Sequence, residues 1–363
     1  MKKRYLLILI ACFFILSPST VKAVETTEKF YSNIDIETDG SIKVKEIFEL
    51  TGSYNGLRRT IKYRNDNAKE FSGVVSDLEG SSIYNGSGIT DLKVSSVSRN
   101  DLTFNSLNDA VNYFSLVSYA DKGESGVYTK NDTSSGTNLL IYNPSNRNEA
   151  FYLEYTIPDV IVVHNDIAEF AFNIFSNEYE ENIKDFKVQV NLPGEDSDFR
   201  AWLHGPLNGY MDRTDNKTAV ATSDFIGAYN AVSIRLLFNK DLVPNATKLS
   251  GMTAKEDIIA YQSKLADEAN ATRDKIKREN DTVKMITVAW YIIGLVLSIL
   301  AMKKVKNSKK TDFAMEYYRD FPGEYGPEVL EYLLNKNVTE KSLSATILNL
   351  IYKKVLKVET VDA

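Results

Sequence analysis

Alternating apolar and polar residues predict β-strands over most of the first 240 positions of the chain. Residues 29–37 and 41–50 alternate in this way and are separated by Asp39-Gly40, a dipeptide that favours a tight hairpin turn. Between residues 150 and 238, further segments rich in β-branched and aromatic residues are separated by Gly and Pro. Strands of this length and spacing predict a mainly β region over residues 24–250, folded as one β-sandwich or as two.

Residues 72–149 interrupt this pattern, because they are richer in Ser, Asn, Gly and Asp. They contain weaker strand signals and one short helical pattern at residues 106–117, and residues 130–138 are typical of a loop. We interpret residues 72–149 as a candidate insertion in the β region.

The pattern becomes helical after residue 252. Residues 253–284 contain neither Gly nor Pro and predict a helical stalk over residues 252–284. Residues 285–302 then carry no charged side chain, and eighteen helical residues span about 27 Å, close to the ~30 Å hydrocarbon thickness of a bilayer. We therefore predict one transmembrane helix over residues 285–302. A weak heptad pattern in the stalk, which includes Ile258, Gln262 and Leu265 and has Leu265 as its only leucine, is compatible with a homo-oligomer.

Flanking charges predict the orientation of this span. Five lysines lie within residues 303–310, and basic residues beside a span favour the cytoplasmic side. The chain begins with three basic residues, an apolar run over residues 5–16 and small residues before position 24, which is the pattern of a cleaved signal peptide over residues 1–23. Both features predict a single-pass protein of the cell membrane, in contact with the lipid bilayer, with its N-terminal region extracellular and its C-terminus cytoplasmic.

Cys12 is the only cysteine of the chain. Residues 9–12 resemble a lipobox, so lipidation of Cys12 is the alternative to cleavage after Ala23, although the long apolar run favours cleavage. After that cleavage the chain has no thiol and only two histidines, His164 and His204. Disulfides and a Cys/His zinc site are therefore disfavoured, and we expect neither a metal nor a cofactor.

The charge of the chain differs between its predicted compartments. Residues 24–284, the predicted outer part, carry 28 Lys and Arg against 40 Asp and Glu, a formal charge of −12. Scattered acids of this kind favour solubility over a specific cation site, although binding of a polycation at a wall surface is the alternative.

Residues 311–363 predict a small cytoplasmic module. Pro327 fits the first position of one helix, Thr339 fits the N-cap of a second, and residues 356–363 read as the start of a strand. Helix, helix, strand is the outline of a winged-helix-like fragment. Its net charge of −3 disfavours nucleic acid as a partner and favours contact with another protein.

Arg59 stands on the apolar face of a predicted strand. In residues 57–64 the odd positions carry Leu57, Arg59, Ile61 and Tyr63, so Arg59 shares its face with three apolar side chains. A buried cation requires a partner, and Glu46 and Glu169 also lie on largely apolar strand faces. We predict a structural ion pair of Arg59 with Glu46 or Glu169. An anion-binding arginine in a cleft is the alternative.

The other candidates carry no catalytic motif. Arg58, Lys62 and Arg64 form either a solvated strand face or a basic strip for a wall polymer or headgroup. Trp202 and His204 are candidate binding residues, and His204, before a Gly-Pro turn, is also a candidate general acid or base. A turn residue is the more common role for such a histidine. No nucleophile elbow, zinc-peptidase motif, phosphate loop or EF-hand spacing is present, so we predict no catalytic residue.

Several stretches in this order resemble the bacterial membrane-protein family catalogued as domain of unknown function 2207. They are GLRRTI at residues 56–61, residues 168–193, AWLHGPLNG at residues 201–209, AWYIIG at residues 289–294 and residues 322–359. The resemblance aligns Arg59, Trp202 and His204 with the family's motif positions. The resemblance implies the arrangement of the outer region, the span and the inner module, and it implies no enzymatic activity. Members usually continue with further spans after the inner module, and a Gly is common where this chain has Lys354.

These features predict a membrane-anchored cell-surface protein that binds, senses or acts as a scaffold at the bacterial envelope. Its partners would be other envelope or membrane proteins. The alternatives are an envelope enzyme acting on polysaccharide, or a subunit of a larger membrane complex.

Overall fold

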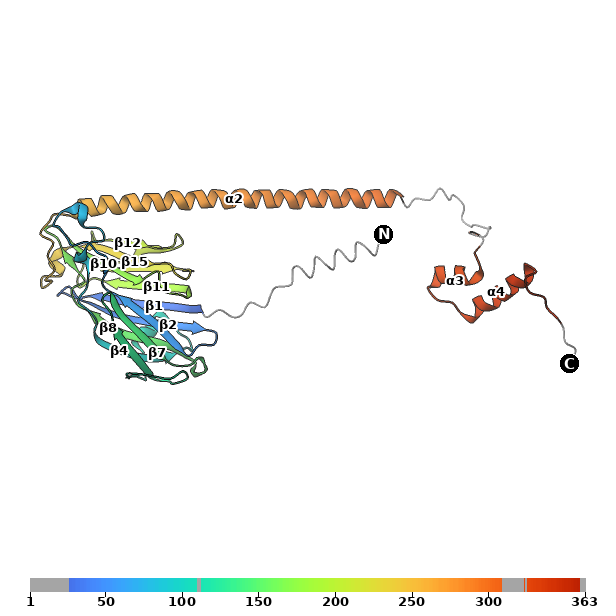
Figure 1. Ribbon diagram of the computed structural model, residues 1–363. Coiled ribbons are helices and arrows are strands. Elements are labelled where there is room, and N and C mark those ends of the chain that lie inside the picture. The colour runs from blue at the N-terminus through green and yellow to red at the C-terminus, as the bar shows by residue number, and fades with distance from the viewer. Residues whose placement is uncertain (1–25, 110–111, 309–322, 324, 360–363) are drawn as a thin grey trace. The chain divides into compact units, whose positions relative to one another are not determined.

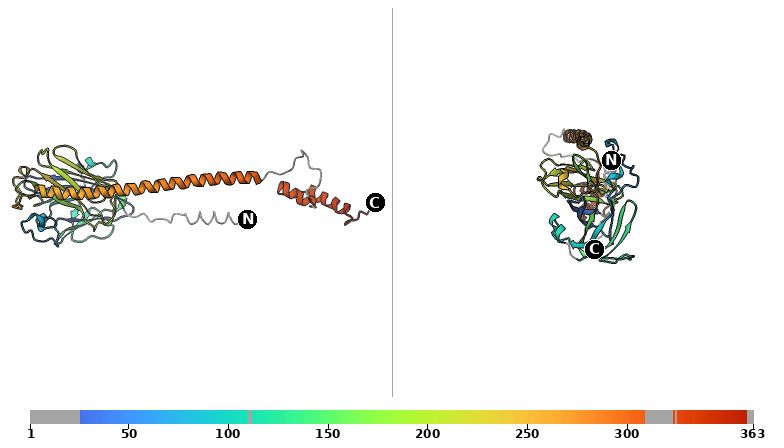
Figure 2. Two further views of the ribbon diagram at one scale, coloured as in Figure 1. Left: turned by 90° about the horizontal axis from the view of Figure 1, so that it is seen from above. Right: turned by 90° about the vertical axis from the view of Figure 1, so that its left-hand side faces the viewer.

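A computed structural model describes residues 26–109, 112–308, 323 and 325–359. Residues 26–238 form a mostly β domain of three sheets, which confirms the mainly β prediction (Figure 1). The predicted signal peptide and Cys12 lie outside the described residues. Figure 2 shows the β domain from two further directions.

The largest sheet has seven strands, and the predicted hairpin lies at its centre. The strand order is β13 (Tyr210–Arg213), β14 (Thr218–Ser223), β11 (Asn182–Asn191), β1 (Thr26–Ile36), β2 (Ile42–Thr51), β8 (Glu149–Ile157) and β4 (Thr90–Ser98). Strands β1 and β2 pair antiparallel across the Asp39-Gly40 turn, where Gly40 has φ +81°. Only a residue without Cβ adopts this backbone easily, which explains the glycine.

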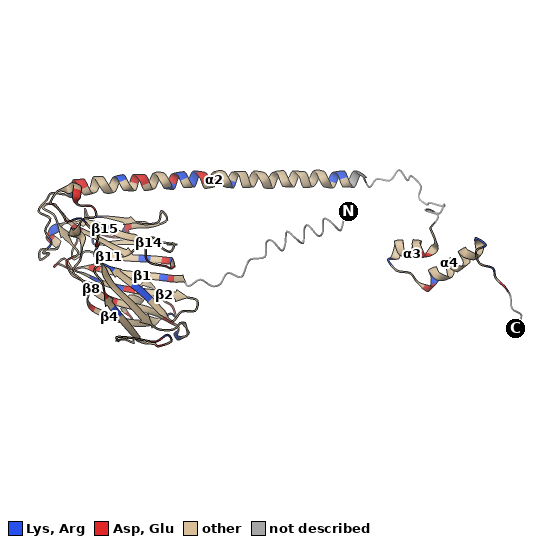
Figure 3. Ribbon diagram, viewed as in Figure 1, with Lys and Arg blue, Asp and Glu red and all other residues tan. Residues whose placement is uncertain are grey.

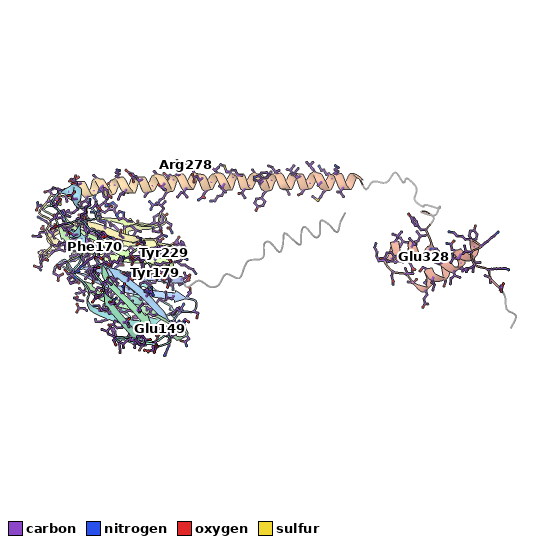
Figure 4. The ribbon with its side chains drawn as sticks, in the orientation of Figure 1. Glu149, Phe170, Tyr179, Tyr229, Arg278 and Glu328 are labelled. Carbon is purple, nitrogen blue, oxygen red and sulfur yellow. The ribbon has the colours of Figure 1, made fainter. Side chains whose placement is uncertain are left out.

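Two four-stranded sheets complete the domain. One has the order β12 (Arg200–His204), β15 (Val232–Phe238), β10 (Ala168–Phe175) and β9 (Val162–Val163). The other has the order β3 (Gly56–Lys62), β7 (Gly136–Tyr142), β6 (Val127–Asp132) and β5 (Ser115–Leu116). Apolar residues of all three sheets pack into one core, which includes Phe30, Ile61 and Phe170. Figure 4 labels Phe170 within the β domain. Burial of this shared core is what holds the sheets together.

The segment of residues 72–149 supplies strands to two of the sheets. Strand β4 pairs with β8 in the large sheet, and β7 pairs with β3. Where the sequence predicts a helix at residues 106–117, the described residues instead contain a 3₁₀ turn, η3 (Phe104–Asn108), followed by β5. The turn places Leu107 in a second apolar cluster with Tyr31 and Tyr152. The other 3₁₀ turns are η1 (Val75–Asp77), η2 (Ser82–Tyr84), η4 (Ser145–Arg147) and η5 (Lys240–Leu242).

Helix α2 (Lys255–Ser308) combines the predicted stalk and span in one 54-residue helix. Asp166 accepts hydrogen bonds from the backbone N–H groups of Ala254 and Lys255, which fixes where the helix starts. Figure 3 shows charged residues along the first part of α2, then an uncharged stretch, then basic residues near its end. The uncharged stretch is long and apolar enough to cross a membrane, and none of it is buried in the protein.

The first turns of α2 pack on the β domain rather than projecting freely from it. Ala254, Ile258 and Gln262 are each no more than 2% exposed. Arg273 donates hydrogen bonds to the carbonyls of Leu207 and Gly209 over 2.6 and 3.2 Å. Ile258 and Gln262, which fall in the heptad pattern, are therefore used within the chain and are not available to a seam between helices.

Two helices follow α2 in the described residues, α3 (Pro327–Asn335) and α4 (Glu340–Tyr352). Thr339 stands at the N-cap of α4, but its hydroxyl donates to Glu331 instead of capping the helix. The winged-helix-like interpretation is not supported, because residues 356–359 are not in a strand and residues 360–363 lie outside the described part. Lys354 has φ +59°, the left-handed conformation that glycine adopts most readily.

Candidate functional site

Arg59 and Glu46 form a buried ion pair between sheets. Nε of Arg59 donates to Oε2 of Glu46 over 3.0 Å, Nη2 donates to Oε1 over 2.6 Å, and each residue is 1% exposed. Arg59 also donates to the carbonyls of Thr60 and Ile174 over 3.2 and 3.0 Å. Because Glu46 lies in β2, Arg59 in β3 and Ile174 in β10, these bonds connect all three sheets.

The surroundings of this pair keep Arg59 charged. The Tyr155 hydroxyl donates to Oε1 of Glu46 over 2.9 Å, and the Phe175 ring centre lies 4.9 Å from the guanidinium carbon of Arg59. Burial alone would lower the pKa of Arg59, but the charge of Glu46 outweighs it and the pKa is raised above its usual value. Glu46 thus occupies the position that an external anion would take.

Glu169 belongs to a separate polar network centred on Arg235. Nε of Arg235 donates to Oε1 of Glu169, and its Nη1 atom donates to Glu79. The Tyr84 hydroxyl accepts from Nη2 of Arg235 over 2.9 Å and donates to Oε2 of Glu169 over 3.0 Å. Burial alone raises the pKa of Glu169, but His164 and Arg235 hold it below its usual value.

Sequence reasoning missed Arg235, because alternation does not mark it as buried. Ser233, Arg235 and Leu237 share one face of β15, whereas the opposite face is entirely apolar. The pattern therefore assigns Arg235 to the more polar face of its strand, and only the tertiary packing against this face buries it.

His164 links this network to the segment that leads into α2. Its Nε2 atom lies 3.0 Å from Oε2 of Glu169, and its Nδ1 atom lies 2.7 Å from the Ser250 hydroxyl. An ionised Glu169 only accepts, so in the neutral imidazole Nε2 carries the proton and Nδ1 accepts from Ser250. His164 is 1% exposed and lies after β9, so the chain of bonds fixes the approach to α2.

A cavity of about 350 Å³ lies where the first turns of α2 cover the sheet that contains β10, β12 and β15. Its walls come from the outward face of these strands, from residues 62–65 and 79–86, and from Tyr261, Gln262 and Leu265 of α2. The opposite face of the same strands packs into the core through residues such as Phe170 and Leu236. The cavity therefore combines a rigid sheet with a helix that continues into the apolar stretch.

The cavity contains His204 but not Trp202. His204 is the last residue of β12 rather than a turn residue, and it is partly exposed. Burial lowers the pKa of His204, and the nearby charge of Arg235 lowers it further, so the imidazole is neutral at pH 7. Trp202 packs with a different apolar cluster, which includes Leu237, Met252 and Ile258, and it lines a different surface hollow, next to Arg200.

The basic residues of β3 and the segment after it do not form one strip. Lys62 and Arg64 line the cavity that contains His204, whereas Arg58 lines a separate hollow beside Tyr179 and Glu178. Lys62 is paired with Glu178, and Arg64 donates to the carbonyls of residues 86 and 87. In the part of the chain that the structure describes, no three His, Cys, Asp or Glu side chains group as metal ligands.

Comparison with protein families gives one match. The family described as "Predicted membrane protein (DUF2207) N-terminal domain" matches residues 26–238, which is more than half of the chain. A search of curated proteins finds no match to this chain.

Solved structures give only distant similarities. A protease candidate from Parabacteroides distasonis shares 14% identity over 60% of this chain and 41% of its own, with a TM-score of 0.31. An M1 zinc metallopeptidase from Deinococcus radiodurans shares 6% identity over 60% of this chain and 43% of its own, with a TM-score of 0.26. The chain thus spans less than half the length of these proteins, and scores this low carry no assignment of fold or activity.

Proposed function

Because the chain belongs to the DUF2207 family of predicted membrane proteins, we propose that it is a membrane-anchored binding protein of the bacterial envelope. Its β domain would bind an envelope component in the cavity between the β10–β15–β12 sheet and α2. The observation that carries this proposal is the cavity itself, which is about 350 Å³ and lined by polar side chains of several elements.

The anchor would be the apolar stretch of α2 over residues 285–302. The lysines that follow favour a cytoplasmic end, and the signal-peptide pattern favours export of what precedes the span. Residues 24–284 would then lie outside the cell and residues 303–363 inside. Helices α3 and α4 expose apolar side chains such as Leu334 and Leu348, which suits a role in protein contact.

The position of the cavity supports a sensing role in addition to binding. A bound ligand would touch Tyr261 and Gln262, and these belong to the same helix as the apolar stretch. A change in how the first turns of α2 pack would therefore be transmitted along a continuous helix.

Blocking the cavity tests the binding function. The full-length protein in lipid nanodiscs is mixed with cell walls isolated from a Gram-positive bacterium, and the bound fraction is measured by sedimentation. Ala171→Phe places a large ring in the cavity, whereas Thr222→Phe adds the same ring at an exposed position of β14. We expect Ala171→Phe to abolish sedimentation and Thr222→Phe to retain it. Equal sedimentation of both variants and the unaltered protein would exclude the cavity as the binding site.

An envelope enzyme acting on polysaccharide is the second candidate function. One observation favours it, namely that His204 and Glu79 line the same cavity. Glu79 is, however, paired with Arg235, which keeps its carboxylate engaged. Release of soluble fragments from the same cell walls, lost in His204→Gln, would support an enzyme; binding without release would support a binding protein.

A further inference from the structure

The charged side chains that line the cavity already have partners. Lys62 pairs with Glu178, Arg235 pairs with Glu79 and Glu169, and Arg64 is held by two backbone carbonyls. A charged ligand would have to compete with these contacts. The side chains in the cavity that remain available to bind a ligand are therefore the neutral polar ones.

Three neutral polar residues form a row across neighbouring strands. Asn173 of β10 pairs in register with Ser233 of β15, and Ser233 pairs with His204 of β12. All three line the cavity, and neither Asn173 nor Ser233 makes a side-chain hydrogen bond to another described residue. Such a row presents a hydroxyl, an amide and a neutral imidazole side by side on a rigid sheet, and each of these groups can both donate and accept.

Gln262 of α2 adds a buried acceptor to this row. The residue is 1% exposed, and its side chain interacts with the His204 ring in a way that favours the protonated imidazole. Its Oε1 atom makes no hydrogen bond of normal length and angle to a described residue. A buried polar atom without a partner is costly, so native structures rarely retain one without a reason. A ligand that donates a hydrogen bond to Oε1 would remove this cost.

Tyr261 provides an aromatic surface next to Gln262. It also lines the cavity and is 43% exposed. An exposed ring beside amide, hydroxyl and imidazole groups offers an apolar face together with donors and acceptors, which is what a sugar ring with its hydroxyls requires.

From this arrangement we infer that the cavity takes a neutral, hydroxyl-rich ligand of the carbohydrate class, held by Asn173, Ser233, His204 and Gln262. This inference rests on the proposed binding function and specifies its ligand.

Gln262→Leu provides a test because it should weaken sugar binding without lowering the stability of the protein. Leucine has a similar size but no polar atom, so the variant loses an acceptor for the ligand and also loses an unpaired buried group. We expect it to raise the dissociation constant for sugars about tenfold, the usual effect of one lost hydrogen bond. We also expect its thermal midpoint without ligand to be equal to or higher than that of the unaltered protein. A structural role for Gln262 would lower the midpoint.

The probes are cellobiose and di-N-acetylchitobiose as neutral sugars, glucuronate as a charged sugar and triglycine as a peptide. Binding to the full-length protein in phosphatidylcholine nanodiscs is measured by isothermal titration calorimetry at millimolar ligand. Gln189→Leu is the matched control, because it makes the same substitution in β11, away from the cavity. We expect a neutral disaccharide to bind, triglycine not to bind, and Gln189→Leu to leave the affinity unchanged.

Failure of this inference is distinguishable from failure of the binding function. If triglycine or glucuronate binds more tightly than both neutral sugars, or if Gln262→Leu and Gln189→Leu have equal effects, the carbohydrate assignment is wrong. If no sugar binds but cell-wall sedimentation is still abolished by Ala171→Phe, the assignment is also wrong and the binding function stands. If Ala171→Phe sediments with cell walls as well as the unaltered protein does, both the carbohydrate assignment and the binding function of the cavity are wrong.

Discussion

Replacing Glu46 with glutamine should destabilise the β domain strongly. The substitution retains the shape of the side chain and an oxygen for the Tyr155 hydroxyl, but it removes the charge that Arg59 meets through two bonds of 3.0 and 2.6 Å. Arg59 is 1% exposed, so water cannot replace the lost partner, and the Thr60 and Ile174 carbonyls supply only dipoles. Removing one member of a buried ion pair costs about 3–5 kcal/mol. That is a large part of a total stability of roughly 5–15 kcal/mol.

Pulse proteolysis of the full-length protein in detergent, across a urea series, measures this loss. The matched control is Glu178→Gln, which breaks the ion pair with Lys62 on the same strand as Arg59. Side chains in that pair are 25% and 56% exposed, so we expect a cost of about 0–1 kcal/mol. The double variant Glu46→Leu/Arg59→Met should recover most of the loss, because it leaves no unpaired charge. Equal costs for Glu46→Gln and Glu178→Gln would refute the reasoning.

Three further predictions concern other contacts. Asp166→Ala should cost about 1 kcal/mol by removing the acceptor for two backbone N–H groups at the start of α2, seen as faster amide hydrogen exchange there. Burial alone raises the pKa of Glu169, but His164 and Arg235 hold it below its usual value. The ionised Glu169 therefore stabilises the folded protein above about pH 4.5, and this contribution is lost as the pH falls. Glu169→Gln should flatten the acid side of a plot of stability against pH. Burial lowers the pKa of Lys248 to about 8, so mass spectrometry should find its acylation half-maximal near pH 8, well below the ~10.4 of a free lysine.

The two-residue period of a β-strand is enough to place Arg59 on a buried face. It cannot choose between Glu46 and Glu169, because the pairing of strands distant in sequence depends on the tertiary fold and not on local alternation. In the structure Glu46 forms an ion pair with Arg59, and Glu169 forms one with Arg235.

The cavity cannot be predicted in the same way. It exists because the first turns of α2 pack back onto the β10–β15–β12 sheet, and periodicity shows which face of a helix is apolar but not what that face meets. The heptad pattern therefore assigns Gln262 and Ile258 to a seam between helices, whereas both are buried against the chain's own β domain. Residues 72–149 stand apart in the sequence because their composition resembles that of loops, although β4 and β7 complete two of the sheets.

Membrane topology is the premise on which the proposed envelope function rests, and cysteine labelling in intact cells tests it most directly. In a Cys12→Ser background, Asp215→Cys places a thiol in an exposed turn of the β domain and Asn337→Cys places one in the exposed turn between α3 and α4. A membrane-impermeant maleimide should label Asp215→Cys in intact cells and Asn337→Cys only after the membrane is permeabilised. Labelling of Asn337→Cys in intact cells, or of Asp215→Cys only after permeabilisation, would contradict the account.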